Sequence, residues 1–313
     1  MQDGVLLVLV GPTGVGKTEL ALRLAEHFQC PILNADSRQI YREIPIGTAA
    51  PTAEEQQRVK HYFVGTKDLD EDYNAGEYER DCLSVLNILQ SYPQADDKHV
   101  LGILSGGSML YIDAVCEGLD DIPAVPPEIR QQVQTLYANG GLEALQQQVQ
   151  QLDPAYWEVV DRQNPQRLMH CIEVCLVSDQ PYSSFRQRRT NKRPFRIVKV
   201  GLTRPRTELY ERINERVLRM MEAGLEDEAR RVYREPVPNS LNTVGYKEMF
   251  GFFRGEMTRD EAVARIQQNS RHYAKRQETW FKRDTDIHWL DATLDYETQL
   301  SIIDTWLDMP GQL

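Results

Sequence analysis

Residues 11–18 carry the strongest chemical signal in the chain. Gly11, Pro12, Thr13, Gly14, Val15, Gly16, Lys17 and Thr18 fit the phosphate-loop pattern G-x-x-x-x-G-K-[ST]. The glycines let backbone N–H groups close around phosphate, Lys17 would contact phosphate oxygens, and the Thr18 hydroxyl suits Mg²⁺. The loop therefore predicts that a diphosphate or triphosphate binds here. Because most such loops hold ATP or GTP, nucleotide binding by a kinase is the first interpretation to consider.

A carboxylate follows the second predicted strand. Residues 31–35 read as a short strand, and Asp36 comes directly after it. The carboxyl ends of parallel strands face the ligand crevice, so we expect Asp36 near the phosphate loop. There it could act as a general base or hold Mg²⁺ through water, and the alternative is that it caps a helix. The later strand 99–105 ends in Ser-Gly-Gly without an acid, which argues against ordinary ATPase machinery.

The elements that would position these residues alternate between strand and helix. Apolar runs predict strands over 5–10, 31–35, 99–105 and 195–202, and helical spacing of apolar residues predicts helices over 19–28 and 77–91. This alternation is typical of an α/β fold with a mostly parallel sheet. Residues 128–177 show helical patterns, and helices dominate again from 205 to about 283. We therefore predict an α/β core from 1–118 and 196–313, with a helical insertion over 119–195.

Composition and charge exclude several classes of protein. The chain has 313 residues and a net charge of −11, which excludes a dedicated DNA coat or a polybasic membrane binder. Segment 186–199 nevertheless holds seven Lys and Arg and no acid, so it is either a local phosphate-binding face or a solvated loop. The five cysteines are scattered and suggest neither disulfides nor a Cys/His zinc site. No apolar run is long enough to span a membrane and the N-terminus does not read as a signal peptide, so we expect a cytoplasmic protein.

Together these motifs resemble the tRNA dimethylallyltransferases, also called tRNA isopentenyltransferases. The resemblance covers nearly the whole chain, in the order GPTGVGKTE, NADSRQIYR, IPIGTA, SGGSMLY, LDP, NPQRLMHCIEV, RINERV, TVGYKEMF and RHYAKRQETWF. It implies transfer of a dimethylallyl group from dimethylallyl diphosphate to N6 of the adenosine just 3′ of the anticodon, with Mg²⁺ assisting. It also implies a P-loop core with a helical insertion, and we expect a monomer.

The resemblance implies roles for individual residues. Asp36 would hydrogen-bond the exocyclic amine and take its proton. Lys17, the loop amides, Mg²⁺ on Thr18 and Arg216 would meet the charge of the leaving diphosphate, with Arg212 the second choice for the arginine. Ser108 stands where the family has threonine, close to the reacting centre.

A further set of residues is expected to hold the tRNA anticodon stem-loop. These are Asp36, Ser37, Arg38, Gln39, Ser108, Arg130, Gln166, Arg167, His170, Arg271, Lys275 and Arg276. Basic groups would position phosphates, while aromatic side chains can stack unpaired bases. At helical spacing, however, Tyr273, Trp280 and Phe281 are more typical of a core.

The chain departs from the family pattern at some positions, and other functions stay open. Ala50 stands where the family has lysine, and residues 60–65 replace a stretch containing two histidines. No C-terminal Cys/His pair is present, which implies a bacterial-type enzyme. The alternatives are prenylation of free adenine nucleotides, a small-molecule kinase and a non-catalytic RNA-binding protein.

Overall fold

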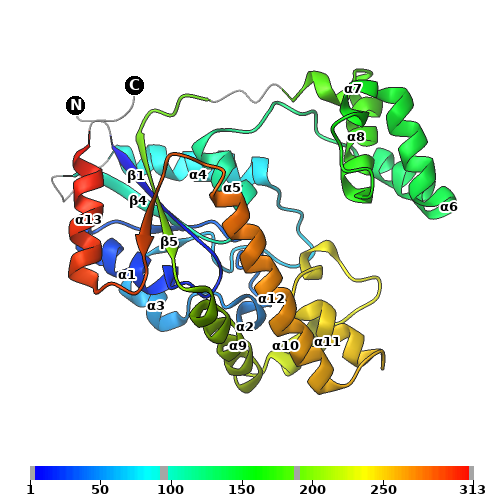
Figure 1. Cartoon of the computed structure of the whole chain (residues 1–313). Helices are drawn as coiled ribbons and strands as arrows, with labels where there is room; N and C mark the ends of the chain where they lie inside the picture. The colour runs from blue at the N-terminus through cyan, green and yellow to red at the C-terminus, as the bar shows by residue number, and fades with distance from the viewer. Residues whose placement is uncertain (1–3, 92–97, 187–190, 310–313) are drawn as a thin grey trace. The chain divides into compact units, whose positions relative to one another are not determined.

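The structure, a computed structural model, describes residues 4–91, 98–186 and 191–309. The chain forms two compact units (Figure 1). The first consists of the described residues of Met1–Cys116 and Lys192–Leu313, and the second is Glu117–Asn191. The two segments of the first unit therefore lie on either side of the second in the sequence. Within the described residues, no helix is long and apolar enough to cross a membrane.

The first unit is built on a six-stranded parallel sheet of order β3-β2-β4-β1-β5-β6. The strands are β1 (Val5–Val10), β2 (Ile32–Asn34), β3 (His61–Tyr62), β4 (Val100–Ser105), β5 (Arg196–Thr203) and β6 (Ile287–Asp291). Strand β1 is buried along its whole length, as its continuous apolar run predicts. The two edge strands, β3 and β6, are absent from the prediction because each is short or mixes polar with apolar residues.

Ten α-helices of the first unit are described. They are α1 (Lys17–His27), α2 (Pro45–Thr48), α3 (Ala53–Arg58), α4 (Ala75–Gln90), α5 (Met109–Cys116), α9 (Arg206–Glu222), α10 (Leu225–Val232), α11 (Tyr246–Phe253), α12 (Arg259–Phe281) and α13 (Tyr296–Asp308). Helices α1 and α13 pack with Val5, Leu7 and Leu9 on one face of the sheet. The connection from β3 to β4 crosses the sheet in the opposite direction to the connection from β1 to β2. Because such connections are right-handed, α4 lies on the face of the sheet opposite to α1.

Local sequence signals set the ends of several helices. Thr258 and Glu261 form a capping box at the start of α12, and the Asn164 side chain caps α8 (Pro165–Ser178). Gly224 follows the end of α9 with a φ of 99°, a left-handed conformation that glycine adopts without strain. These residues fix where the long helices begin and end, and hence which side chains face the sheet edge.

The second unit is helical in its described residues. It contains α6 (Pro127–Leu152), α7 (Pro154–Trp157) and α8, packed around a core that includes Val149, Leu168 and Ile172. Helix α6 is broken at Gly141, whose φ of 62° lies outside the helical region. The absence of strands here agrees with the helical pattern that the sequence shows over 128–177.

Candidate functional site

The phosphate loop lies at the carboxyl end of β1 and leads directly into α1. Gly11, Gly14 and Gly16 have φ values of 140°, 81° and 122°, which residues other than glycine rarely adopt. A Cβ on Gly11 would lie 2.9 Å from the Leu202 carbonyl oxygen, so the loop needs glycine there for space as well. The predicted strand–loop–helix context of the motif is confirmed.

Lys17 folds back over this loop. Its Nζ donates to the carbonyl oxygens of Gly11 (2.7 Å) and Pro12 (2.9 Å). Burial is the main cause that lowers the pKa of Lys17 to about 7; the positive charge of Arg216 lowers it further, and the negative charge of Asp36 opposes both. An ammonium held under these conditions favours a bound anion, which would restore the charge balance.

Two cavities open beside the loop and meet at the same residues. The loop cavity, about 490 Å³, is lined by Lys17 and Thr18 among others. The side cavity, about 380 Å³, is lined by Ser37, Ser108 and Arg276 among others. The residues that line both are Thr13, Asp36, Arg216 and Tyr273. Two ligands bound in these cavities would meet at Asp36 and Arg216.

Asp36 follows β2 and lies beside the phosphate loop, where the sequence places it. Its Oδ1 accepts the backbone N–H of Arg38 (2.9 Å) and of Gln39 (3.3 Å). The capping alternative is thus partly right, but Asp36 caps a turn rather than a helix. A Cβ added to Gly107 would lie 3.4 Å from Oδ2, so this second oxygen lies next to Gly107, which lines the loop cavity. One oxygen thus holds the turn, and the other lies beside the wall of the loop cavity.

Three arginines of α9 line the loop cavity. They are Arg212, Arg216 and Arg219, spaced so that one helical face presents them all. Arg216 Nη1 donates to Thr13 Oγ1 (3.2 Å), while Arg212 Nε donates to the Gly14 carbonyl oxygen (2.9 Å). Burial lowers the pKa of Arg216 and the charge of Asp36 opposes that shift. Both arginines that the sequence proposes therefore contact the loop, and Arg216 also reaches the junction of the cavities.

Gln277 is a site residue that the sequence does not single out, although it lies in the 271–281 stretch expected to hold RNA. It is fully buried on α12, where its Oε1 accepts the Thr13 N–H and its Nε2 donates to the Gly107 carbonyl oxygen, both at 2.8 Å. Tyr273 Oη donates to the same carbonyl oxygen (2.8 Å). Gln277 thus fixes the loop after β1 against the loop after β4. Its signal was the specific stretch YAKRQETWF, which contains it.

The aromatic residues of α12 divide between cavity and core. Tyr273 lines both cavities, so the core interpretation is wrong for this residue. Phe281 is buried, in agreement with that interpretation. Trp280 is partly exposed and its Nε1 donates to Asp113 Oδ2 (2.9 Å).

The other predicted residues near Asp36 already hold neighbouring loops. Ser108 Oγ donates to Ser37 Oγ (3.0 Å) and accepts the Ser37 N–H (2.8 Å). Arg38 Nη1 donates to the carbonyl oxygens of Asn239 and Ser240. Gln39 Nε2 donates to the carbonyl oxygens of Thr48 and Ala49, both at 3.0 Å. Each of these side chains still lines one of the cavities.

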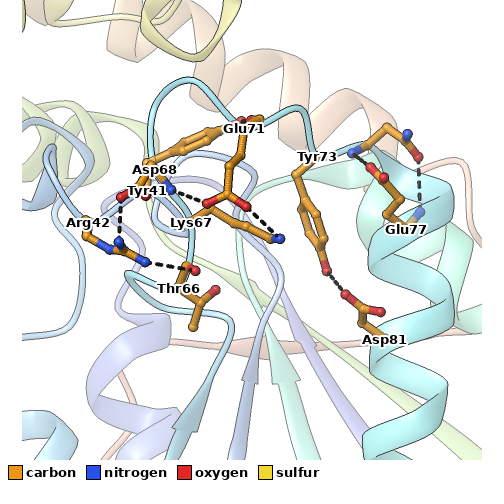
Figure 2. Close-up of polar contacts among 10 residues, drawn as sticks. Tyr41, Arg42, Thr66, Lys67, Asp68, Glu71, Tyr73, Glu77 and Asp81 are labelled. Carbon is orange, nitrogen blue, oxygen red and sulfur yellow. Dashed lines mark hydrogen bonds and ion pairs between the residues drawn. The ribbon is translucent and has the colours of Figure 1, made fainter.

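The turn that carries Asp36 is also held from its far end. Figure 2 shows the loop before α4 joined to this region by Tyr41 and Arg42. Tyr41 Oη donates to the Glu71 carbonyl oxygen (3.3 Å), and Arg42 pairs with Asp68 (2.5 Å). Each exposed ion pair of this kind contributes little to the free energy of unfolding. The main effect of these contacts is therefore to hold the loop in one conformation.

Two departures from the family pattern lie at the loop cavity. Ala50 stands between Ala49 and Pro51, which both line it. His61 also lines it, and its Nδ1 lies 2.8 Å from the Val59 carbonyl oxygen. A carbonyl only accepts, so Nδ1 carries the proton, and burial lowers the pKa of His61. Burial at this cavity therefore favours the neutral form of the His61 imidazole.

Three basic residues of α12 differ in their surroundings. Arg276 lines the side cavity, with its guanidinium 5.6 Å from the Tyr273 ring centre. Arg271 donates to Asn214 Oδ1 (2.5 Å) on α9. Lys275 lies instead beside a separate small hollow that Arg204 also lines. Only Arg276 of the three lines a cavity that Asp36 also lines.

The remaining predicted RNA contacts lie on the second unit. Gln166, Arg167 and His170 are exposed on one face of α8, and Arg130 is exposed on α6. The His170 ring packs edge-on against Tyr182, with ring centres 5.4 Å apart. Their role in holding RNA stays a prediction.

In the described part of the basic segment 186–199, three cations are bound within the first unit and are neither free for phosphate nor simply solvated. Arg193 donates to the carbonyl oxygens of Ala114 (2.6 Å) and Val115 (2.9 Å) and pairs with Glu79 (2.6 Å). Arg196 donates to backbone carbonyls near the end of α13, and Lys199 pairs with Asp284 (2.6 Å). These three cations bind acids and backbone carbonyls of the first unit. Residues 187–190 lie outside the described residues.

Among the described residues, possible metal ligands are considered at two places. Thr18 is exposed at the start of α1 in the loop cavity, and its hydroxyl is the oxygen type that Mg²⁺ accepts. In the second unit Asp153, Cys171 and Cys175 come together, a cluster not expected from the sequence. Asp153 already accepts hydrogen bonds from Tyr156 N–H, Ser183 N–H and Ser183 Oγ, so its carboxylate serves the local fold.

Known proteins are similar to this chain in sequence and in architecture. Residues 39–284 match the IPP transferase family. The chain is 52% identical to tRNA dimethylallyltransferase 1 of Phocaeicola vulgatus, covering 94% of this chain and 96% of that protein. It is also 52% identical to tRNA dimethylallyltransferase 2 of Porphyromonas gingivalis, over 96% and 99% of the two chains. The crystal structure of a tRNA isopentenylpyrophosphate transferase from Bacillus halodurans is similar, with a TM-score of 0.68, 29% identity, and coverage of 98% and 97%.

Proposed function

Because the chain belongs to the IPP transferase family of tRNA dimethylallyltransferases, we propose that it transfers a dimethylallyl group from dimethylallyl diphosphate to N6 of the adenosine 3′ of the anticodon in tRNA. It is a prenyltransferase, and its acceptor is tRNA. The donor, the position of the adenosine and the roles of individual residues are parts of the proposal. The relatives are named as tRNA enzymes, which does not favour free adenine nucleotides or a kinase substrate.

The observation that carries the mechanism is the meeting of two cavities at Asp36 and Arg216. The diphosphate would occupy the loop cavity beside Lys17, and the adenine would enter the side cavity. N6 would attack C1 of the dimethylallyl group, forming the new C–N bond as the C–O bond to diphosphate breaks. The proton on N6 would pass to Asp36 Oδ2, since Oδ1 is occupied by the turn.

The charge released on the leaving diphosphate would be met by positive groups around the loop. Lys17, Arg212 and Arg216 all contact the loop, and backbone N–H groups of the glycine-rich turn add to them. The Thr13 N–H is excluded from this set because it donates to Gln277. Removing one donor of this kind typically lowers a rate by about 10²–10³-fold.

The loop cavity also suits a magnesium ion held mainly by the donor. The exposed Thr18 hydroxyl would supply a protein ligand, and the phosphate oxygens would supply the others. When bound, Mg²⁺ would neutralise part of the charge on the diphosphate.

The adenosine must leave its base stack to reach the side cavity. Tyr273 and Arg276 line that cavity, and an aromatic ring beside a guanidinium can stack an unpaired base. The exposed face of α8 would hold other parts of the RNA. We place the reaction in the cytoplasm, where tRNA is available.

The decisive experiment is analysis of modified nucleosides by mass spectrometry. Transfer RNA is incubated with the protein, Mg²⁺ and dimethylallyl diphosphate, and we expect N6-dimethylallyladenosine at the position after the anticodon. Parallel reactions supply AMP as acceptor or ATP labelled in its γ-phosphate. Faster prenylation of AMP than of tRNA, or transfer of the label to a metabolite, would contradict the proposal.

A further inference from the structure

Glu228 is a buried carboxylate whose hydrogen-bond partners are all neutral. It lies on α10 with 0% of its surface exposed. Its Oε2 accepts the Ile46 N–H (2.9 Å), and its Oε1 accepts the Gly47 N–H (2.8 Å) and the Tyr246 Oη–H (2.5 Å). Burying a carboxylate is costly unless such bonds compensate it. The three donors come from two separate parts of the chain, so Glu228 joins them.

The two N–H groups that Glu228 accepts open α2, a helix of a single turn. A helix this short is not stable by itself, and its first N–H groups have no partner within the helix. Glu228 satisfies two of them from outside. Tyr246, itself fully buried, packs directly against the same turn, because a Cβ on Gly47 would lie 2.4 Å from Tyr246 Oη. The position of α2 therefore depends on these two side chains.

Helix α2 lines the side cavity, and the residue after it lines the loop cavity. Gly47 and Thr48 line the side cavity, and Ala49, just after the helix, lines the loop cavity. The Gln39 Nε2 donates to the carbonyl oxygens of Thr48 and Ala49, both at 3.0 Å. The Gln39 N–H in turn donates to Asp36 Oδ1 (3.3 Å). A chain of hydrogen bonds thus runs from Glu228 through α2 and Gln39 to Asp36.

We propose that Glu228 and Tyr246 are positioning residues for prenyl transfer, holding α2 so that Gln39 and the Asp36 carboxylate take their reactive arrangement. This inference rests on the proposed function, since it assigns Asp36 to the chemistry. Small displacements of a catalytic group cost much rate; about 1 Å can lower it 10²-fold. Loosening α2 should therefore reduce the rate of transfer more than it reduces substrate affinity.

The test compares Glu228→Gln with Asp153→Asn. Both wild-type carboxylates are fully buried and both accept three hydrogen bonds, but Asp153 lies in the second unit. The assay is single-turnover prenyl transfer with tRNA and donor saturating. We expect Glu228→Gln to lower the rate about 10- to 100-fold. Asp153→Asn should lose a comparable amount of stability in urea but keep its rate.

A second readout does not depend on activity. Hydrogen exchange at the Ile46 and Gly47 amides should speed up in Glu228→Gln and stay slow in Asp153→Asn. Tyr246→Phe keeps the ring against Gly47 and removes the hydrogen bond to Glu228. It can therefore replace Glu228→Gln in the test if that variant fails to fold. We expect a several-fold loss of rate from it, and a non-additive effect when it is combined with Gln39→Ala.

Two results would overturn the inference. One is a wild-type rate in both Glu228→Gln and Tyr246→Phe. The other is full additivity with Gln39→Ala, which would mean that the pair stabilises the fold without acting through α2. Lack of transfer by the wild-type protein would instead refute the proposed function, so the two failures are distinguishable.

Discussion

Asp36→Asn is the sharpest test of the reacting centre because the two oxygens of Asp36 have different tasks. The Oδ1 atom holds the turn through the N–H groups of Arg38 and Gln39. An asparagine can keep both bonds with its own Oδ1, since Asn and Asp are similar as caps. Its amide nitrogen would then replace Oδ2 on the cavity side. The change removes the proton acceptor and leaves the turn in place.

The expected size of the effect follows from general-base catalysis. Loss of a general base typically costs about 10²–10⁴-fold in rate, or about 3–5 kcal/mol of activation free energy. The affinity for tRNA should change little, because the turn and its neighbours keep their contacts. Donor affinity is measured separately, since the Asp36 charge raises the pKa of Lys17 and its loss leaves that amine less protonated.

The assay must therefore separate chemistry from binding. Single-turnover transfer with donor and tRNA both saturating measures the chemical step alone. Glu55→Gln is the matched control, because Glu55 also lines the loop cavity and its capping-box role can pass to glutamine. A near-normal rate for Asp36→Asn, or an equal loss in Glu55→Gln, would remove Asp36 from the mechanism.

Two further predictions concern the buried positive charges of Lys17 and Arg193. The pKa of Lys17 is lowered to about 7, so above that pH the free site holds a neutral amine and diphosphate binding should take up a proton. Calorimetry near pH 8 in buffers of different ionisation enthalpy should show this uptake, which Lys17→Met should lack; equal uptake in the two proteins would contradict it. Arg193→Ala should lower the free energy of unfolding by about 3–5 kcal/mol, because the Arg193 and Glu79 side chains are only 8% and 15% exposed. Urea denaturation measures this loss, and weakened tRNA binding by a variant of unchanged stability would instead favour the phosphate-binding face.

The basic segment 186–199 illustrates why a charge run cannot be interpreted from sequence alone. Seven cations without an acid look like an RNA-binding face. The acids and carbonyls that Arg193 and Lys199 engage come from distant parts of the chain, such as Glu79 and Asp284. Since those partners are invisible locally, only the folded structure separates a bound cation from a free one.

What the sequence determined by itself depends on short-range geometry. The glycine spacing of the phosphate loop, the buried strand before it and the helix after it are all local. The position of Asp36 also follows locally, because the carboxyl ends of parallel strands share one edge of the sheet. The resemblance added the family and the choice of Arg216, which does contact the loop through Thr13.

Only the tertiary structure decided how these parts are held together. Gln277 reaches Thr13 from 264 residues away, and Glu228 reaches Gly47 from 181 residues away. Neither contact has a local pattern, because a buried glutamine or glutamate looks like an ordinary surface residue of a helix until its partners are known. The meeting of two cavities at Asp36 has the same origin. It arises where segments after β1 and β2 meet α9 and α12, which no spacing along the chain records.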